Sequence, residues 1–149
     1  MKVKDAMTED VCTISPQSTL REAARCLSER DAGILPVEEN DRLVGMITDR
    51  DIVIRAVAEG RGPETPVRDV MSQEVLYCRD DDDIEDVARN MADIQVRRLP
   101  VIDRDKRLVG IVSLADFAVA GSSGAAGRAL EGVARPGGRH NQSDGAARV

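Results

Sequence analysis

The sequence contains almost no aromatic residues: Tyr77 and Phe117 are the only two among 149, and tryptophan is absent. Proteins that hold single-stranded nucleic acids stack the bases on several aromatic side chains, so this scarcity argues against that class. A basic surplus is also missing, because the formal net charge is −6. Since nucleic-acid binding requires a positively charged face, we expect no nucleic-acid partner.

Long apolar runs are missing as well. No stretch approaches the roughly 18 consecutive apolar residues of a membrane-spanning helix, and residues 1–5 lack the apolar core of a signal peptide. We therefore expect a cytoplasmic protein with no membrane partner.

Histidine is nearly absent, since His140 is the single one and lies near the C-terminus. The sequence thus shows no nucleophile with an adjacent base, and we expect no catalytic residue. The acidic run at residues 80–83 is explained by a turn followed by a helix cap, because a lone run rarely supplies the oxygen ligands that Ca²⁺ needs. We expect no metal site.

Three cysteines, Cys12, Cys26 and Cys78, form an odd set without CxxC spacing and lie in apolar segments. We interpret them as reduced residues of the core, with redox sensing as the open alternative.

The most informative feature that is present is an internal repeat. A shift of 64 positions aligns residues 3–7 with 67–71 and residues 35–37 with 99–101, and a shift of 65 aligns residues 42–45 with 107–110. Residues 1–60 and 67–121 are therefore two copies of one unit, joined by a linker at residues 61–66 that is rich in glycine and proline. We expect residues 122–149 to form a flexible tail, with one possible helical piece at residues 125–133.

Each copy predicts the order β-α-β-β-α, so the fold class is α/β in the broad α+β sense. In the first copy, Thr19 and Glu22 form a capping box before a helix with apolar spacing, and Asp83 takes the cap in the second copy. A hairpin at residues 34–47 and a helix at residues 49–59 follow, and Pro36 and Pro100 suggest that their strands lie or begin at an edge. Because each copy has only about 55 residues, the two should pack about a pseudo-twofold axis.

One motif occurs in both copies. Gly-Met-Ile-Thr-Asp-Arg-Asp at residues 45–51 recurs as Gly-Ile-Val-Ser-Leu-Ala-Asp at residues 110–116. In each, a buried strand ends at a hydroxyl residue, Thr48 or Ser113, where a phosphate can be held. An aspartate follows one turn later, Asp51 or Asp116, placed to accept hydrogen bonds from the hydroxyls of a sugar. Plain helix capping would also explain both residue types, so both interpretations stay open.

The repeat, the Leu-Pro-Val strands and the doubled motif resemble the cystathionine-β-synthase-type domain pair, known as a CBS pair. The resemblance covers residues 1 to about 120. It implies a flat module that binds an adenosyl compound (AMP, ADP or ATP, with S-adenosylmethionine or NAD as further candidates) in clefts between the two copies. It also implies a disc-shaped homodimer and a regulated partner protein that the sequence does not name.

The resemblance also implies which residues contact the ligand. One cleft would join Val11, Ala32 and Gly33 to Ser113 and Asp116, and the other would join Val75, Val96 and Arg97 to Thr48 and Asp51. Arg97 or Arg98 would meet phosphate, as cationic residues do in nucleotide-sensing members, unless both are surface cations. The first copy has no cation at this step, so we expect unequal occupancy of the two clefts.

Three functions compete at this point. The sequence favours a sensor of adenine nucleotides that has no catalytic activity. A ligand-free scaffold for dimerisation or partner docking is the alternative, and an enzyme of unknown type is the third hypothesis.

Overall fold

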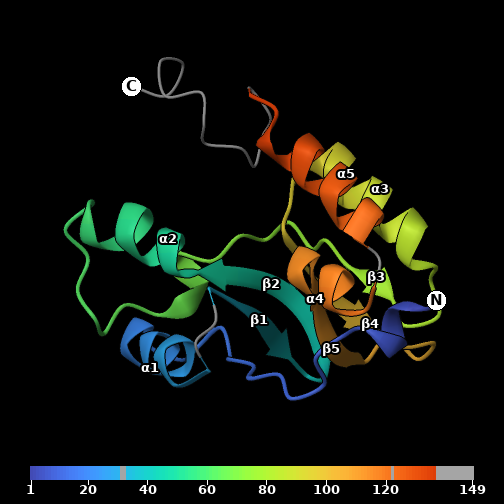
Figure 1. Cartoon of the computed structure of the whole chain (residues 1–149). Coiled ribbons are helices and arrows are strands. Elements are labelled where there is room, and N and C mark those ends of the chain that lie inside the picture. The colour runs from blue at the N-terminus through green and yellow to red at the C-terminus, as the bar shows by residue number, and fades with distance from the viewer. Residues whose placement is uncertain (31–32, 122, 137–149) are drawn as a thin grey trace. The chain divides into compact units, whose positions relative to one another are not determined.

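The computed structural model describes residues 1–30, 33–121 and 123–136 (Figure 1). Among the residues discussed above, Ala32, His140 and the end of the expected tail lie outside this description. The chain mixes helices with small β-sheets, so the α+β fold class is confirmed.

The chain divides into two compact units. Unit 2 comprises Asp10–Leu76 with Lys106–Leu108, and unit 1 comprises Met1–Glu9, Tyr77–Asp105 and the chain from Val109 onward. The units therefore do not coincide with the two halves of the sequence, because each contains a short segment from the other half.

Unit 2 is built from a helix and a hairpin. Helix α1 (Leu20–Arg30) begins where the sequence predicts, since the Thr19 hydroxyl accepts a hydrogen bond from the Glu22 amide at 3.2 Å. Strands β1 (Ile34–Glu39) and β2 (Arg42–Thr48) pair antiparallel. The turn residues between them, Asn40 and Asp41, have φ of 55° and 62°, which is the backbone that a tight two-residue hairpin needs.

Strand β2 runs directly into a helix. Helix α2 (Asp49–Asp51) continues as the π-helix η2 (Ile52–Val57). The predicted helix is thus present, and Gly60 follows it with a φ of 79°, although the π-helical winding was not predicted. Ala56 points into the core of unit 2 beside Leu35 and Val70, whereas the opposite face of η2 is exposed.

Unit 1 has the corresponding elements. Its sheet contains β3 (Cys78–Arg79), β4 (Arg98–Ile102) and β5 (Leu108–Ser113), with β4 in the middle. Helix α3 (Ile84–Ile94) begins at the predicted cap, because the Asp83 carboxylate accepts the Glu85 amide at 2.9 Å. Helix α4 (Leu114–Val119) follows β5 and buries Phe117.

Short segments are exchanged between the two halves of the sequence. In unit 1, the first residues form the 3₁₀ helix η1 (Val3–Asp5), and Thr8 exchanges two backbone hydrogen bonds of 2.9 Å with Ile111. In unit 2, the 3₁₀ helix η3 (Val67–Asp69) leads to Ser72, which pairs with Met46 in the same manner at 2.8 and 3.0 Å. Strands β2 and β5 are therefore each flanked by a segment from the other copy.

The edge position expected for the proline-containing strands is wrong for β4, which lies in the middle of its sheet. Strand β1 belongs to a two-stranded sheet and meets Ile14 on its other side in an isolated bridge. Strand β4 lies between β3 and β5, yet β3 pairs only with Val101 and Ile102, so Pro100 lies beyond that ladder and needs no donor. Strand β1 is flanked by β2 and by Ile14, whose amide donates to the Pro36 carbonyl at 3.2 Å. Proline is tolerated there because it acts only as an acceptor.

The cysteines also differ from expectation. Cys12 and Cys26 form a disulfide, which overturns their interpretation as reduced core residues. Their spacing of 14 residues carries no pairing signal, so the sequence could not reveal the bond. Cys78 is a free, buried thiol, as expected.

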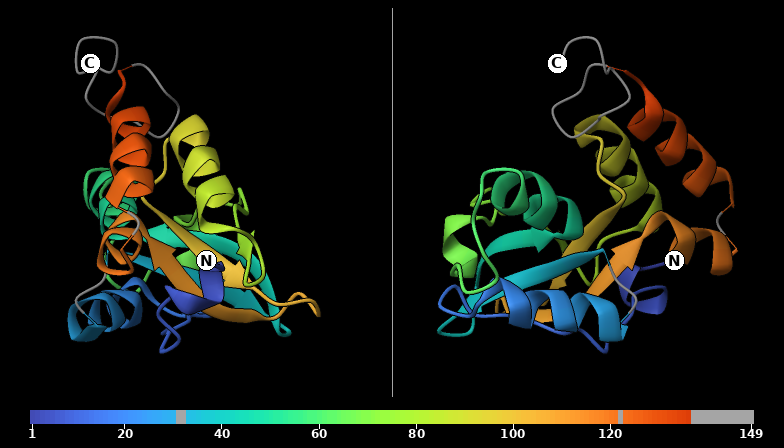
Figure 2. Two further views of the ribbon diagram at one scale, coloured as in Figure 1. Left: turned by 45° about the vertical axis from the view of Figure 1, so that its right-hand side comes forward. Right: turned by 90° about the vertical axis from the view of Figure 1, so that its left-hand side faces the viewer.

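Part of the expected tail is a helix. Helix α5 (Ser123–Ala134) covers the predicted helical piece and packs beside α3 and against α4, and Figures 1 and 2 show α3 and α5 side by side. The Gln95 side-chain amide, which follows α3, donates to the carbonyls of Gly132 and Arg135 at 3.0 and 2.6 Å. Arg128 pairs with Glu85 at 2.6 Å, so α5 is held to α3 by polar contacts as well as apolar ones.

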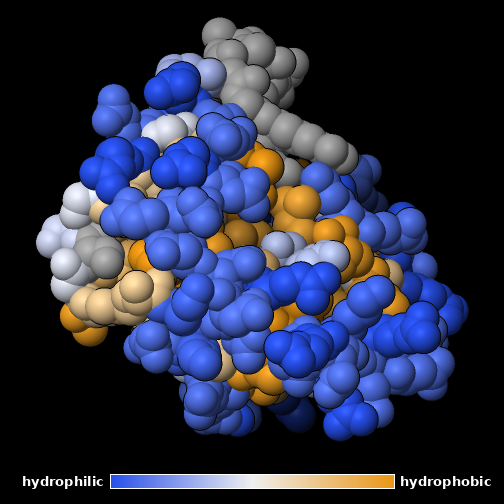
Figure 3. Space-filling view, turned by 90° about the vertical axis from the view of Figure 1, so that its right-hand side faces the viewer, coloured by the Kyte–Doolittle hydropathy of each residue, from blue (hydrophilic) through white to orange (hydrophobic). Residues whose placement is uncertain are grey.

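None of the described helices combines the length and apolar character that crossing a membrane requires. Hydrophilic side chains cover most of the face that Figure 3 shows, and apolar atoms are visible between them.

Candidate functional site

The motif of the first copy forms a reciprocal hydrogen-bonded box at the start of α2. The Thr48 hydroxyl accepts the Asp51 amide at 3.0 Å, and the Asp51 Oδ2 accepts the Thr48 amide at 3.0 Å. Thr48 has extended backbone and Asp51 is the third helical residue, which is the arrangement of a capping box. The Asp51 side chain is 21% exposed, so it is neither buried nor turned freely into solvent.

The second copy builds the same box at the start of α4. The Ser113 hydroxyl accepts the Asp116 amide at 3.2 Å, and the Asp116 Oδ2 accepts the Ser113 amide at 2.8 Å. The predicted recurrence of hydroxyl and carboxylate is therefore matched by recurrence of their geometry. The capping role left open by the sequence is shown, and it uses one oxygen of each carboxylate.

In each unit, the residue before the proline-containing strand contacts the first residue of the helix that follows the box. The Gly33 carbonyl accepts the Asp49 amide at 3.2 Å, and the Arg97 carbonyl accepts the Leu114 amide, also at 3.2 Å. Within each unit, the backbone joins Gly33 to the Thr48 motif and Arg97 to the Ser113 motif, a grouping that the sequence analysis did not make. Glycine and arginine thus occupy corresponding positions beside the two boxes.

Arg55 is a neighbour of Asp51 that the sequence analysis missed. Its Nε lies 4.0 Å from the Asp51 Oδ1, and its Nη1 donates to the carbonyls of Val70 and Met71 at 3.1 and 3.2 Å. The spacing of four residues along a helix was the available signal. The corresponding residue after Asp116 is Ala120, so only the first copy places a cation there.

The other predicted contact residues lie on the extended or irregular segments of their own units. Val11 precedes α1 in unit 2, and Val75 lies in the irregular stretch after η3; both are half-buried. Val96 is half-buried before β4, whereas the neighbouring side chains of Arg97 and Arg98 are exposed.

The described residues contain no group of three or more histidine, cysteine or acidic side chains that could hold a metal ion. Asp83 of the acidic run serves instead as the cap of α3.

Comparison with known proteins decides the family. The model of the CBS domain matches twice, at residues 3–57 and 67–122. The chain belongs to the CBS-domain family. Its pair of CBS domains is similar to the CBS domain-containing protein YhcV of Bacillus subtilis, with 46% identity over 132 residues that cover 88% of this chain and 94% of YhcV.

Two solved structures of CBS proteins show bound groups. Hypoxic Response Protein I was crystallised with two coordinated zinc ions; it has 39% identity and a TM-score of 0.72, covering 80% of this chain and 98% of that one. The CBS domain pair of protein MJ0100 was solved with 5′-methylthioadenosine and S-adenosyl-L-methionine; it has 28% identity and a TM-score of 0.72, covering 83% and 98%. Proteins similar to this chain therefore bind different ligands.

Proposed function

We propose that this CBS pair is a regulatory module without catalytic activity that binds an adenosyl ligand such as AMP, ADP or ATP. The observation that carries the proposal is the repeated box, because Thr48 with Asp51 and Ser113 with Asp116 have the same geometry in both units. Support also comes from the similar domain pair of MJ0100, which holds two adenosyl compounds.

The chemistry of the box suits a ribose. Capping engages the Oδ2 of each aspartate. The Oδ1, which in Asp51 also lies 4.0 Å from the Arg55 Nε, can accept hydrogen bonds from the paired hydroxyls of a sugar. Arginine suits the charged end of a phosphorylated ligand because its planar guanidinium matches phosphate oxygens. The proposed contacts beyond the two boxes are those implied by the family: Val11, Ala32, Gly33, Val75, Val96, Arg97 and Arg98.

Thermal unfolding with and without ligand tests this function. A bound ligand raises the unfolding free energy by about 2.7 kcal/mol at a hundredfold excess over Kd, so AMP, ADP, ATP or S-adenosylmethionine should raise the Tm. The double variant Asp51→Asn, Asp116→Asn should lose the ligand-induced shift. Asp83→Asn is the matched control, because Asp83 also caps a helix but lies outside both boxes. A double variant that responds like the parent would refute the site.

The scaffold alternative is favoured by one observation, namely that capping alone accounts for both boxes without a ligand. If no adenosyl compound changes the Tm and the protein is nevertheless a stable oligomer, the scaffold replaces the sensor.

The partner in either case is a second copy of the chain. The exposed face of α2 and η2 carries apolar side chains that a monomer would leave in water, namely Val53 (55% exposed), Ile54 (46%) and Val57 (66%). Such an unpartnered apolar face marks a docking surface.

The charges that flank this face are self-complementary. Asp49 and Arg50 begin the helix, and Glu59 and Arg61 follow its end. If two copies pair antiparallel across a twofold axis, the start of each helix, with Asp49 and Arg50, lies beside the end of the partner's helix, where an acidic and a basic residue also follow. Native mass spectrometry should therefore find a dimer for the parent and a monomer for Val53→Glu. Leu130→Glu, at an exposed apolar position on α5, should remain dimeric; the reverse result would move the interface to α5.

A further inference from the structure

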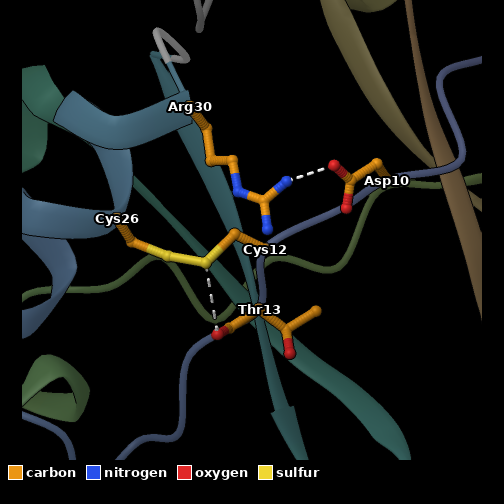
Figure 4. The surroundings of a disulfide bond; sticks show 5 residues. All are labelled: Asp10, Cys12, Thr13, Cys26 and Arg30. Carbon is orange, nitrogen blue, oxygen red and sulfur yellow. Dashed lines mark hydrogen bonds and ion pairs between the residues drawn. A yellow bond between two sulfur atoms is a disulfide. The ribbon is translucent and has the colours of Figure 1, made fainter.

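The disulfide in unit 2 joins the irregular segment before α1 to that helix. Cys12 lies in the segment before α1 and Cys26 lies on α1, with their Cα atoms 6.6 Å apart (Figure 4). An ion pair between Asp10 and Arg30 lies beside the bond. Residues 10 and 12 are two positions apart in the segment before α1, and residues 26 and 30 share one face of that helix. The disulfide and the ion pair therefore both connect the segment before α1 to the same face of α1.

The disulfide is the main constraint on residues 11–13. In the described part of the chain, no backbone hydrogen bond is formed by these three residues, and the nearest ones are those of Ile14, whose amide donates to Pro36 at 3.2 Å and whose carbonyl accepts from Glu38 at 2.9 Å. The Asp10–Arg30 pair is solvent-exposed, with side-chain exposures of 79% and 43%, and an exposed pair holds a segment weakly. Removing the covalent link would leave residues 11–13 held only at their ends and by the packing of Cys12 against the core of unit 2.

We propose that Cys12 and Cys26 form a thiol–disulfide exchange site whose oxidation state controls how firmly residues 10–14 are held against α1. The co-reactant is a thiol, either a small molecule or a dithiol protein. Its thiolate attacks one sulfur to form a mixed disulfide, and a second thiolate releases it; two electrons and two protons convert the bond into two cysteine thiols while two donor thiols become one disulfide. In a cytoplasm, where thiols are normally reduced, such a bond would be transient and responsive.

The three cysteines differ in a manner that supports this assignment. Cys12 and Cys26 are both half-buried, so a thiol reagent can reach the bond. Cys78 is 4% exposed, and burial, together with the negative charge of Asp82, raises the pKa of its thiol to about 12. Because the thiolate is the reactive form, Cys78 is inert at neutral pH and serves as an internal control.

The consequence for ligand binding rests on the proposed function, because Val11 is one of the residues proposed to contact the ligand. Val11 directly precedes Cys12 in the chain, so the bond that holds Cys12 to α1 also restricts the backbone of Val11. The oxidised form should therefore present Val11 in one orientation, and the reduced form should bind an adenosyl ligand several-fold more weakly.

Hydrogen exchange and cysteine labelling of the full chain test the switch. After oxidation, N-ethylmaleimide added under denaturing conditions should label only Cys78, and peptide mapping without reductant should show Cys12 linked to Cys26. Reduction with a phosphine should give three labelled cysteines and faster exchange of the Ile14 and Glu38 amides, because their hydrogen bonds with Pro36 and Ile14 anchor the segment to β1. Cys12→Ser and Cys26→Ser should exchange fast under both conditions, whereas Cys78→Ser should respond like the parent.

The outcomes separate the two proposals. Absence of the linked peptide after oxidation, or identical exchange of the Ile14 and Glu38 amides in the two states, overturns the switch. Failure of every adenosyl ligand to bind in either state refutes the proposed function instead, and a redox-dependent exchange of these two amides would still support the switch.

Discussion

A Cβ atom on Gly45 would lie 2.6 Å from the backbone carbonyl oxygen of Ser72. The same relationship occurs in unit 1, where a Cβ on Gly110 would lie 2.8 Å from the Thr8 carbonyl and 2.8 Å from the Met7 Sδ. The glycine that opens each motif is thus required by the segment exchanged from the other copy, which crosses the strand there. Its role is to permit this close backbone approach.

Replacing Gly45 with alanine should therefore destabilise unit 2. Because the obstructing atom belongs to the backbone, the segment must shift, and overpacking of this kind costs about 1–3 kcal/mol. Gly62→Ala is the matched control, since nothing lies within 4 Å of its Cβ position and its expected effect is below about 0.5 kcal/mol. Urea unfolding of the two variants measures the difference, and equal stabilities would contradict the crossing geometry.

The packing of α5 on α3 gives a second prediction, which rests on a glycine at their contact. A Cβ on Gly132 would lie 2.5 Å from the Ala92 Cβ on α3, whereas a Cβ on Gly127 would meet nothing within 4 Å. Gly132→Ala should therefore loosen α5 and speed its amide exchange, while Gly127→Ala should stabilise it by roughly 0.5–1 kcal/mol through helix propensity. If both substitutions protect α5 equally, the close packing of α5 on α3 is wrong.

The parts of the fold that the sequence predicts are local ones. The caps at Thr19 and Asp83 and the hairpin turn at residues 40–41 follow from residues only a few positions apart, so short-range rules are sufficient. The repeat extends this prediction to both copies. The exchange of residues 1–9 and 67–76 was not predictable in this manner, because pairing such as that of Thr8 with Ile111 depends on contacts far apart in sequence.

The candidate site likewise contains features that were predictable from the sequence and features that were not. The pairs Thr48 with Asp51 and Ser113 with Asp116 are three residues apart, and their boxes were recognisable as capping motifs. The Cys12–Cys26 bond was not, because nothing in a 14-residue spacing distinguishes partners among three cysteines. Which side chains from distant segments face each box depends likewise on tertiary structure.

Glu38 gives a prediction for pH. Burial, with a further contribution from the charge of Asp41, raises the pKa of the Glu38 carboxyl above its usual 4.5. The folded state then holds the proton more tightly than the unfolded state, so the associated stability is complete below pH 4.5 and is lost as pH rises through the folded-state pKa. Glu38→Gln should accordingly raise the Tm at pH 7 and leave it nearly unchanged near pH 4. Glu59→Gln, at an exposed position in the turn after η2, is the surface control.

Arg55 provides a test of how the first motif is connected to the exchanged segment. Its guanidinium contacts the carbonyls of Val70 and Met71 while facing the Asp51 Oδ1, so it links the proposed ribose carboxylate to the segment that crosses Gly45. Because the side chain is half-exposed, Arg55→Ala should cost only about 1 kcal/mol. The loss should be local: exchange of the Ser72 amide, which donates to Met46 at 2.8 Å, should become faster.

Unit 1 supplies the control for this experiment, because Ala120 stands where Arg55 stands in unit 2. The Ile111 amide, which donates to Thr8 at 2.9 Å, should exchange at the same rate in the Arg55→Ala variant as in the parent. Faster exchange at both amides would mean that the substitution destabilises the whole protein rather than the contact between Arg55 and the crossing segment.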